Sequence, residues 1–267
     1  MIRRPPRSTL SSSSAASDVY KRQGSSRGIG KSIAVELAKQ GAYIVLNGRN
    51  QSRLESAKLE LGKIHNNIVS YCCDVSDINQ ANELIKTAIQ HFGKLDILVV
   101  ASGINSVAKI EDMKLEVFLD IMDANVTQSW LCARAAIKQM KTQETGGKVV
   151  LMSSARGLLG HPAGYTAYCA SKSAIDGITK ALGCEVGNNN ITVNAIAPTV
   201  FRSPLTAWMF EDNEEAQKVR SAFLSRVPKG RLGEPDDLIG PLLFLTSAAS
   251  DFYTGHILYA DGGYTAG

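Results

Sequence analysis

Short apolar runs alternate with longer amphipathic segments along most of this chain, and this alternation limits the folds that it can adopt. The apolar runs predict strands at Tyr43–Leu46, Ile68–Cys72, Leu95–Val100, Gly147–Met152, Ile191–Ala197 and His256–Tyr259. Helical spacing predicts helices at Lys31–Gln40, Gln51–Ile64, Asp77–Phe92, Leu115–Lys141, Tyr168–Val186 and Pro235–Ala249. Strands that alternate with helices of this length indicate an α/β fold, a doubly wound parallel sheet in three αβα layers.

The composition narrows the class of protein. The 267 residues are enough for one large α/β domain, and no repeat, linker or change of composition divides the chain after residue 24. A net charge of +4 is too small and too dispersed to indicate a nucleic-acid partner, and the apolar runs are far shorter than a membrane span. Five cysteines without a Cys-x-x-Cys pair favour reduced core thiols in a cytoplasmic protein, and four scattered histidines indicate no metal site.

A glycine-rich loop, Gly24-Ser25-Ser26-Arg27-Gly28-Ile29-Gly30, leads directly into a helical pattern. Glycines allow a tight turn and a close approach of the backbone to a pyrophosphate, and the N-terminus of a helix attracts phosphate. Such a loop by itself is more often only a turn. Here it is followed by a helix, Gly41 and the strand Tyr43–Leu46, which is the order of a Rossmann-like βαβ unit for a dinucleotide.

The end of the second strand bears on the choice of dinucleotide. An acidic residue there would bind the ribose 2′-hydroxyl of NAD, but the strand closes with Asn47-Gly48-Arg49-Asn50. Arg49, with Arg27 of the loop, is suited to a 2′-phosphate, which favours NADP(H) over NAD(H). The alternative is that both arginines are merely solvated and do not contact the cofactor.

Tyr168 and Lys172 are four residues apart at the start of a helical pattern, so they lie on the same face of a helix. An ammonium group beside a phenol favours the phenolate, and a tyrosine tuned in this way can exchange a proton with an alcohol or a ketone. Ser153 and Ser154 stand at the carboxyl end of a predicted strand, where ligands of such sheets bind. Asn125 lies among apolar residues inside a predicted helix, where a buried amide needs a partner or a task.

From Gly24 to the C-terminus the chain resembles the short-chain dehydrogenase/reductase family. The motifs that carry the resemblance are Gly24-x-x-x-Gly28-x-Gly30, Asp74-Val75, Asn125, Ser154, Tyr168-x-x-x-Lys172, Asn194-Ala195-Ile196-Ala197-Pro198 and Asp261-Gly262-Gly263. The resemblance implies that Tyr168 is the general acid/base and that Ser154 binds the substrate oxygen. It implies that Lys172 lowers the pKa of Tyr168 and holds the nicotinamide ribose. Asn125 would fix a water that relays protons to Lys172.

The resemblance also implies a set of cofactor-binding residues: Gly24, Ser26, Arg27, Gly28, Ile29, Gly30, Arg49, Asp74, Val75, Ala101, Ser102, Gly103, Tyr168, Lys172, Pro198 and Val200. The chain departs from the family's pattern in four ways. Gln23 replaces a Thr, Val100-Ala101-Ser102-Gly103 replaces Asn-Asn-Ala-Gly, and Thr199 replaces a Gly. The spacing from Ser154 to Tyr168 is one residue longer than usual, so Ser153 is the fallback for the catalytic serine.

Residues 199–231 are too many for a plain connection and resemble the family's substrate lid, with Trp208-Met209-Phe210 either over the substrate or packed on the core. Arg156, His161 and Arg202 would suit a carboxylate. We therefore expect an NAD(P)-dependent enzyme that interconverts a secondary alcohol and a ketone, with a sugar acid such as gluconate or ketogluconate as substrate. A 3-oxoacyl thioester reductase and a non-catalytic dinucleotide-binding protein are the alternatives. Surplus apolar residues on the last two long helices, and the resemblance, predict a homodimer or homotetramer.

Residues 1–23 differ from the rest of the chain. They are rich in Arg and Ser and resemble a translated sequencing-adapter artefact, while a transit peptide to an organelle is the alternative. They stand where the family has its first strand, so we expect a non-native segment in place of that strand. We expect Met1 to about Ser14 to be disordered or loosely attached, and Ser17–Gln23 to form a poor central strand or to leave the slot empty. The chain as written should then be unstable and bind cofactor weakly.

Overall fold

The computed structural model describes residues 8–12 and 28–267. Seven parallel strands form one sheet in the order β3-β2-β1-β4-β5-β6-β7. The strands are β1 Ser8–Ser12, β2 Tyr43–Gly48, β3 Ile68–Cys72, β4 Ile97–Val100, β5 Gly147–Met152, β6 Ile191–Pro198 and β7 Ile257–Ala260. The strand order reverses at β1, and the predicted single α/β domain with a doubly wound parallel sheet is confirmed.

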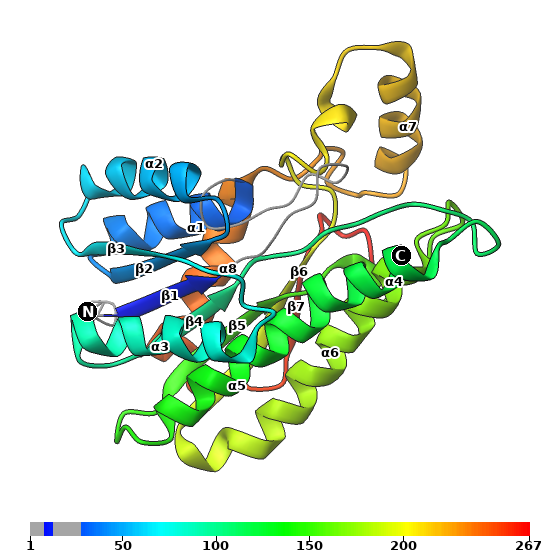
Figure 1. The fold of residues 1–267 in the computed structure, drawn as a ribbon. Coiled ribbons are helices and arrows are strands. Elements are labelled where there is room, and N and C mark those ends of the chain that lie inside the picture. The colour runs from blue at the N-terminus through cyan, green and yellow to red at the C-terminus, as the bar shows by residue number, and fades with distance from the viewer. Residues whose placement is uncertain (1–7, 13–27) are drawn as a thin grey trace.

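Helices cover both faces of this sheet, as Figure 1 shows. Their bounds are α1 Gly28–Lys39, α2 Gln51–Gly62, α3 Ile78–Phe92, α4 Leu115–Met122, α5 Gln128–Met140, α6 Thr166–Val186, α7 Glu214–Leu224 and α8 Ile239–Leu245. The helices α1, α2 and α8 pack on one face, and α3, α5 and α6 pack on the other. Strands β2, β4, β5 and β6 are therefore buried along most of their length, which explains why their sequences are mainly apolar, whereas the edge strands β3 and β7 are partly exposed.

Local sequence signals explain where several helices begin and end. Asn50 and Asp77 cap the N-termini of α2 and α3, because each side chain accepts hydrogen bonds from backbone N–H groups of the first turn. Gly93 ends α3 in the left-handed region, at φ 80°. The predicted helix Pro235–Ala249 is shorter than expected, and its Leu238, Leu242 and Leu245 are buried in the core. Several of the apolar residues that suggested subunit contacts are thus buried inside the subunit itself. The homodimer or homotetramer stays a prediction.

The central slot of the sheet is occupied by Ser8–Ser12. This strand pairs with β2, with Ser8 opposite Tyr43, and with β4, with Ser12 opposite Val100. Our expectation that Ser17–Gln23 would occupy the slot or leave it empty was wrong, and so was the expectation that Ser8–Ser12 would be loosely attached. Residues 17–23 themselves lie outside the described residues. Parallel pairing needs only backbone N–H and C=O groups, so a Ser-rich segment can satisfy the edges of both neighbours.

The predicted helix Leu115–Lys141 is interrupted in the structure. Between α4 and α5 the chain makes a single π-helical turn, Asp123–Thr127, which contains the buried Asn125. In the described part of the chain, no helix is both long enough and apolar enough to cross a membrane.

Candidate active site

The predicted catalytic side chains meet at the carboxyl edge of the sheet. Ser154 is the second residue after β5, and Tyr168 and Lys172 lie on the first turns of α6, which packs beside that strand end. Lys172 is 3 % exposed, and its Nζ lies 5.7 Å from the centroid of the Tyr168 ring. Ser154 donates a hydrogen bond to the Tyr168 phenol that favours the phenolate. The structure thus brings the predicted serine, tyrosine and lysine together.

Asn125 is held by the chain that follows β4. Its Oδ1 accepts a hydrogen bond from the Ile104 backbone N–H at 2.7 Å, and its Nδ2 donates to the Ile104 carbonyl at 2.9 Å. Nδ2 also donates to Ser171 Oγ on α6, at 2.9 Å. A Cβ added at Gly103 would lie 3.3 Å from Asn125 Oδ1 and 3.4 Å from Lys172 Nζ. The amide and the ammonium group therefore face the same small space, as a proton relay between them would need.

Burial dominates the proton affinities of the catalytic pair. Burial raises the pKa of Tyr168 to about 12, and the hydrogen bond from Ser154 opposes this shift. Burial lowers the pKa of Lys172 to about 8, opposed by the charge of Asp176. The lowering of the Tyr168 pKa by Lys172, which the resemblance implies, stays a prediction. It requires that Lys172 carry its proton, and a buried lysine gives that proton up more readily.

The Ser153 hydroxyl already has a hydrogen-bond partner in the protein. This favours Ser154 over the fallback Ser153 as the serine that binds the substrate oxygen. Ser153 is 2 % exposed, and its Oγ donates to Asp176 Oδ1 at 2.5 Å. Asp176 lies one turn after Lys172 on α6 and is 7 % exposed. Sequence reasoning missed this carboxylate, because a single Asp in a helix is normally a solvated residue.

The predicted cofactor residues line the same edge of the sheet. Gly28, Ile29 and Gly30 begin α1, with Gly28 at φ 58°, while Gly24, Ser26 and Arg27 lie outside the described residues. The others follow strand ends: Arg49 after β2, Asp74 and Val75 after β3, Ala101, Ser102 and Gly103 after β4, and Pro198 and Val200 at and after the end of β6. Strand ends at a topological switch point are where dinucleotides bind in such sheets.

The residues present fit a nicotinamide dinucleotide. Ser102 is 3 % exposed, and its hydroxyl has no hydrogen-bond partner among the described residues. A buried hydroxyl without a partner is costly, and a bound ligand at this edge could supply one. Gly103 keeps the space beside Asn125 and Lys172 free of a side chain. The same orphaned hydroxyl lies next to Ala101, where the family's asparagine is missing.

Arg49, the candidate for a 2′-phosphate, already contacts an acid. Its Nη1 lies 2.5 Å from Asp74 Oδ2, and the two side chains are 21 % and 31 % exposed. The other carboxylate oxygen of Asp74 accepts hydrogen bonds from the backbone N–H and hydroxyl of Ser76, and from Gln128 Nε2 at 3.4 Å. Asp74 and Arg49 thus form one connected polar group, which spacing alone did not predict.

A basic cluster lies beside the catalytic residues. We define it as Arg156, Arg226 and His161; the two arginines contact Tyr264, and His161 contacts Tyr165. Arg156 Nη2 donates to the Tyr264 hydroxyl at 2.8 Å, and the Arg156 and Arg226 guanidinium carbons lie 5.4 and 4.7 Å from the Tyr264 ring centroid. The His161 ring contacts Tyr165, with 4.5 Å between centroids, and Tyr165 contacts Tyr168 edge-on at 6.4 Å. Sequence reasoning found Arg156 and His161 but missed Arg226 and Tyr264, which only the fold brings to this place.

Arg202, the third cation expected near the substrate, is already paired. Its Nε donates to both carboxylate oxygens of Glu234, at 3.0 and 2.9 Å, and its guanidinium lies 4.0 Å from the Phe210 ring centroid. The assignment of Arg202 to a substrate carboxylate is therefore not supported by its contacts.

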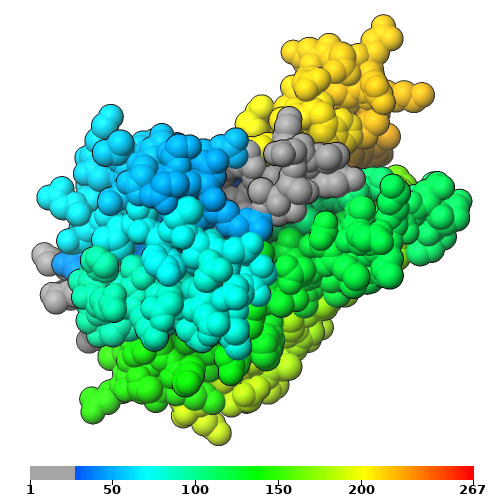
Figure 2. Space-filling view, in the orientation of Figure 1, coloured from blue at the N-terminus to red at the C-terminus, as the bar shows by residue number. Residues whose placement is uncertain are grey.

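The expected lid contains a short 3-10 turn, Ala207–Phe210, and α7. In Figures 1 and 2 this segment stands out from the body of the molecule. Met209 is 5 % exposed, whereas Trp208 is 44 % exposed. Met209 thus packs inward, Trp208 keeps an exposed aromatic surface, and a role of this segment over the substrate stays a prediction.

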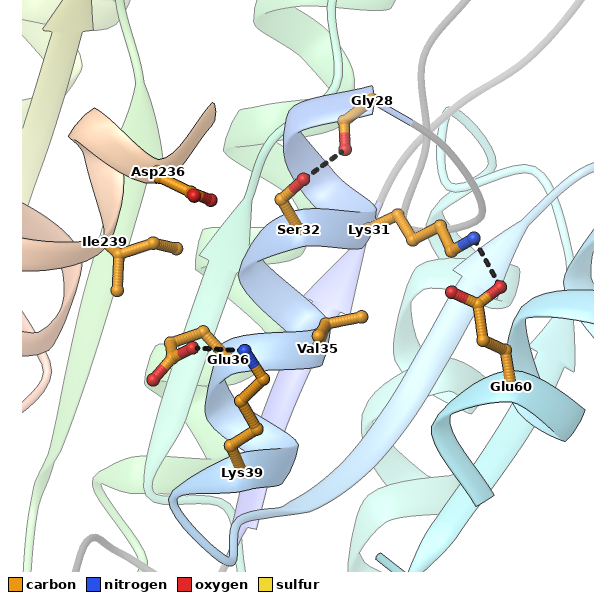
Figure 3. Close-up of a pocket in the computed structure, with 9 residues that line it drawn as sticks. All are labelled: Gly28, Lys31, Ser32, Val35, Glu36, Lys39, Glu60, Asp236 and Ile239. Atoms are coloured by element: carbon orange, nitrogen blue, oxygen red, sulfur yellow. Dashed lines mark hydrogen bonds and ion pairs between the residues drawn. The ribbon is translucent and has the colours of Figure 1, made fainter. Parts of the chain in front are cut away.

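A separate hollow of about 320 Å³ lies on the outer side of α1, between α2 and the turn that precedes α8 (Figure 3). Its charged side chains largely pair with one another: Lys31 contacts Glu60 at 2.5 Å, and Lys39 contacts Glu36 at 3.2 Å. None of the catalytic residues lines it. We assign the chemistry to the carboxyl edge of the sheet and not to this hollow.

Comparison with known proteins agrees with this site. A family model described as enoyl-(acyl carrier protein) reductase matches residues 24–265. An uncharacterized oxidoreductase of Mycobacterium tuberculosis (strain H37Rv) is 44% identical over 243 residues, which are 91% of this chain and 89% of that protein. The 3-oxoacyl-[acyl-carrier-protein] reductase of Rickettsia conorii is 36% identical over 241 residues, 90% of this chain and 93% of that protein. A gluconate 5-dehydrogenase from Burkholderia cenocepacia, solved in complex with NADP and tartrate, superposes with a TM-score of 0.87 at 28% identity, covering 98% of this chain and 96% of that chain.

The fold and the comparisons together define the class of protein, a dinucleotide-dependent oxidoreductase built on one doubly wound domain. The chain belongs to the short-chain dehydrogenase/reductase family. The family resemblance inferred from the motifs is thereby confirmed, and the chain is an enzyme of this family.

Proposed function

We propose that this enzyme interconverts a secondary alcohol and a ketone on a small acidic substrate, such as gluconate or a ketogluconate, with NADP(H) as the preferred cofactor. The observation that carries the substrate class is the basic cluster beside Tyr168. Two guanidinium groups lie within reach of the same buried tyrosine ring, and neither forms an ion pair with a carboxylate of the described residues.

Four other arginines of the described chain have acidic partners. Arg49, Arg202, Arg220 and Arg231 each lie within ion-pair distance of an Asp or a Glu. Arg156 instead donates to a carbonyl and to a phenol, and it acts electrostatically on Tyr165 and Tyr168. Burial and the charges of Arg156 and Arg226 lower the pKa of His161. Cations held close together without a counter-ion repel one another, so a bound anion would stabilise the cluster.

The fixed geometry of Arg156 suits a carboxylate. Tyr264 is 2 % exposed and stacks on Phe223 of α7, with 5.1 Å between centroids, so the ring that holds both arginines is itself held by packing. A planar guanidinium that is already oriented loses little conformational entropy when it binds a carboxylate with two hydrogen bonds. The cluster would place the acidic end of the substrate and leave a hydroxyl or keto carbon near Tyr168 and Ser154.

The roles of the catalytic residues follow from their positions. Tyr168 would give a proton to the ketone oxygen, or take one from the alcohol, while Ser154 orients that oxygen by a hydrogen bond. Lys172, when protonated, would favour the phenolate of Tyr168, and Asn125 would hold a water between Lys172 and solvent. The nicotinamide supplies or accepts the hydride when bound. The residues at the strand ends from Arg49 to Val200 would hold this cofactor, and residues 199–231 would form a lid over the substrate.

A 3-oxoacyl thioester is the second candidate substrate, because several relatives are named 3-oxoacyl-[acyl-carrier-protein] reductases. The two candidates differ in what the basic cluster would do. A carboxylate close to the reacting carbon uses Arg156 and Arg226 directly, whereas an uncharged oxoacyl group does not. NADP(H) is proposed on Arg49, and relatives solved with bound NADP are consistent with that choice.

The test compares substrates and variants together. The enzyme is assayed with NADP+ or NADPH against sugar acids, the matching uncharged polyols, and oxoacyl thioesters. We expect sugar acids to have the highest kcat/KM, and Arg156→Met and Arg226→Met each to lose about tenfold or more of it through KM, as expected for one charge-assisted contact. The same variants should change the kcat/KM for uncharged polyols by less than about threefold.

The matched control is Arg134→Met, an exposed arginine on α5 whose guanidinium carbon lies 5.9 Å from the Trp130 ring centroid. It should leave both substrate classes unchanged. A higher kcat/KM for oxoacyl thioesters than for every sugar acid would replace the proposed substrate class with the second candidate.

A further inference from the structure

The charge state of Lys172 decides whether the catalytic pair can work as proposed. Lys172 is 3 % exposed, and its Nζ donates to the Met152 carbonyl at 2.8 Å. A neutral carbonyl offsets only part of the cost of burying an ammonium group. If the lysine loses its proton, it no longer favours the Tyr168 phenolate. Another group must therefore support the positive charge.

Asp176 is placed to do this. It follows Lys172 by one helical turn on α6, and residues four apart on a helix lie on the same face. Asp176 is 7 % exposed, and burial raises its pKa, opposed by the hydrogen bond from Ser153 and by the charges of Lys180 and Lys172, which favour the carboxylate. The carboxylate acts on Lys172 electrostatically, in the direction that favours the ammonium form.

The carboxylate of Asp176 is fixed by its surroundings. Ser153 Oγ donates to Asp176 Oδ1 at 2.5 Å. A Cβ added at Gly157 would lie 2.5 Å from Asp176 Oδ2, so only a glycine leaves room for the carboxylate there. The Gly157 carbonyl in turn accepts a hydrogen bond from Ser173 Oγ of α6, at 2.7 Å. Strand β5, the turn after it and α6 thus combine to hold one buried acid close to the catalytic lysine.

We propose that Asp176, fixed by the Ser153 hydroxyl, is a positioning residue that keeps Lys172 protonated and thereby keeps Tyr168 competent for proton transfer. This inference rests on the roles proposed above for Tyr168 and Lys172, and it gives Ser153 a task other than substrate binding. Asp176 does not contact the reacting atoms and acts only through Lys172.

The other titratable groups around this pair are few. On α6, Tyr168 lies one turn before Lys172, and Lys180 lies one turn after Asp176 and favours its ionised form. On β7, Tyr259 is influenced by Asp176, whose charge adds to burial in raising the pKa of this tyrosine. From β5 and the π-helical turn, Lys172 meets only neutral groups, the Met152 carbonyl and the region of Asn125. Asp176 is accordingly the carboxylate that acts on Lys172.

The experiment measures the titration of Lys172 directly and without catalysis. Protein labelled with 13C-lysine is titrated by NMR without cofactor, and Lys172→Met identifies the resonance of Lys172. In Asp176→Asn the amide can still accept the hydrogen bond from Ser153, but the charge is gone. We expect the titration midpoint of Lys172 to fall by about 1 pH unit, as the loss of a nearby opposite charge implies. In Ser153→Ala the charge remains but is less fixed, so the midpoint should fall by a smaller amount.

The activity should follow the same shift. A lysine that must be protonated works below its pKa and fails above it, so a lower pKa moves the alkaline limb of kcat to lower pH. On that limb Asp176→Asn should be about tenfold slower than the unmutated enzyme at the same pH. At pH values well below the limb the two should have similar kcat.

The matched control is Asp96→Asn, the same substitution at an acid that is 8 % exposed but precedes β4, at the opposite edge of the sheet. It should leave the Lys172 midpoint unchanged. An unchanged midpoint in Asp176→Asn, with or without a lower melting temperature, would show that Asp176 is only structural. If Asp176→Asn fails to fold, an unchanged midpoint in Ser153→Ala overturns the proposal. A shifted midpoint with an unshifted rate profile would support the electrostatic link and contradict the catalytic role proposed for Lys172, so the two ideas fail separately.

Discussion

Replacing Arg49 should change which dinucleotide the enzyme prefers. Arg49→Ala removes the only cation of the described residues that stands at the end of β2, where a ribose 2′-phosphate would lie. A charge-assisted contact between arginine and phosphate contributes about 1.5–3 kcal/mol. NAD lacks this phosphate, so the substitution should lower the kcat/KM for NADP and leave that for NAD nearly unchanged.

The contact with Asp74 reduces the expected magnitude. Arg49 Nη1 lies 2.5 Å from Asp74 Oδ2, with side chains 21 % and 31 % exposed, and a partly exposed ion pair is worth about 1 kcal/mol. If a 2′-phosphate shares or displaces this pair, the net gain falls to about 0.5–2 kcal/mol, or about 2-fold to 30-fold in preference for NADP. Asp74→Asn removes the competing charge. It should raise the preference for NADP to about 10-fold or more, although the affinity for both dinucleotides falls.

The assay is the ratio of kcat/KM for NADP to that for NAD, measured with one substrate for the unmutated enzyme, Arg49→Ala and Asp74→Asn. Dissociation constants from fluorescence titration check that the ratio reflects binding. Arg53→Ala is the control, because this arginine is exposed on α2, one turn beyond the strand end. An unmutated enzyme that uses NAD as well as NADP would refute the proposed preference. A lower ratio in Asp74→Asn would show that Asp74 orients Arg49 for the phosphate and does not compete for it.

Two further predictions concern the proton and the first strand. Tyr168→Phe should abolish turnover while the dinucleotide still binds, and Lys172→Met should lose turnover and also bind the dinucleotide more weakly. Near-normal turnover of Tyr168→Phe in a steady-state assay would contradict the proposed role of Tyr168. Replacing Met1–Gln23 with an apolar strand that ends in Thr should raise the melting temperature and the affinity for cofactor, since a central strand flanked by β2 and β4 is normally apolar. Equal stability and affinity of the two proteins would show that Met1–Gln23 serves as well as the strand it was expected to replace.

The regular parts of the fold were predictable because their signals are local. The strands Ile68–Cys72 and Gly147–Met152 have the predicted bounds, and Asp77 is the N-cap of the helix that it was predicted to begin. A buried strand needs a run of apolar residues, and a capped helix needs a particular side chain at one position, so each can be recognised from a few neighbouring letters. The first strand failed this test, because Ser8–Ser12 has the backbone pairing of a central strand without its usual composition.

The site was predictable where its chemistry follows a fixed spacing. Tyr168 and Lys172 are a turn apart on one helix, so their meeting depends on no other element. Arg226 and Tyr264 are distant from Arg156 in the sequence, and only the packing of α7 and the last residues of the chain brings them together. The contact of Asp74 with Arg49, and that of Asp176 with Ser153, likewise join separate elements. Long-range contacts of single polar side chains leave no periodic pattern, so a sequence alone does not reveal them.

The π-helical turn at Asp123–Thr127 makes the active site sensitive to the length of the chain at that point. A turn of this type holds one residue more than the α-helical turn that it replaces. Deletion of a single residue there would convert the turn into an α-helical one, so that α4 and α5 join as a continuous α-helix without a large rotation of either half. The local widening that holds Asn125 against the Ile104 backbone groups would then be lost. Substitutions within Asp123–Thr127 can therefore be absorbed one side chain at a time, whereas a deletion of one residue would separate the amide from the lysine in a single step.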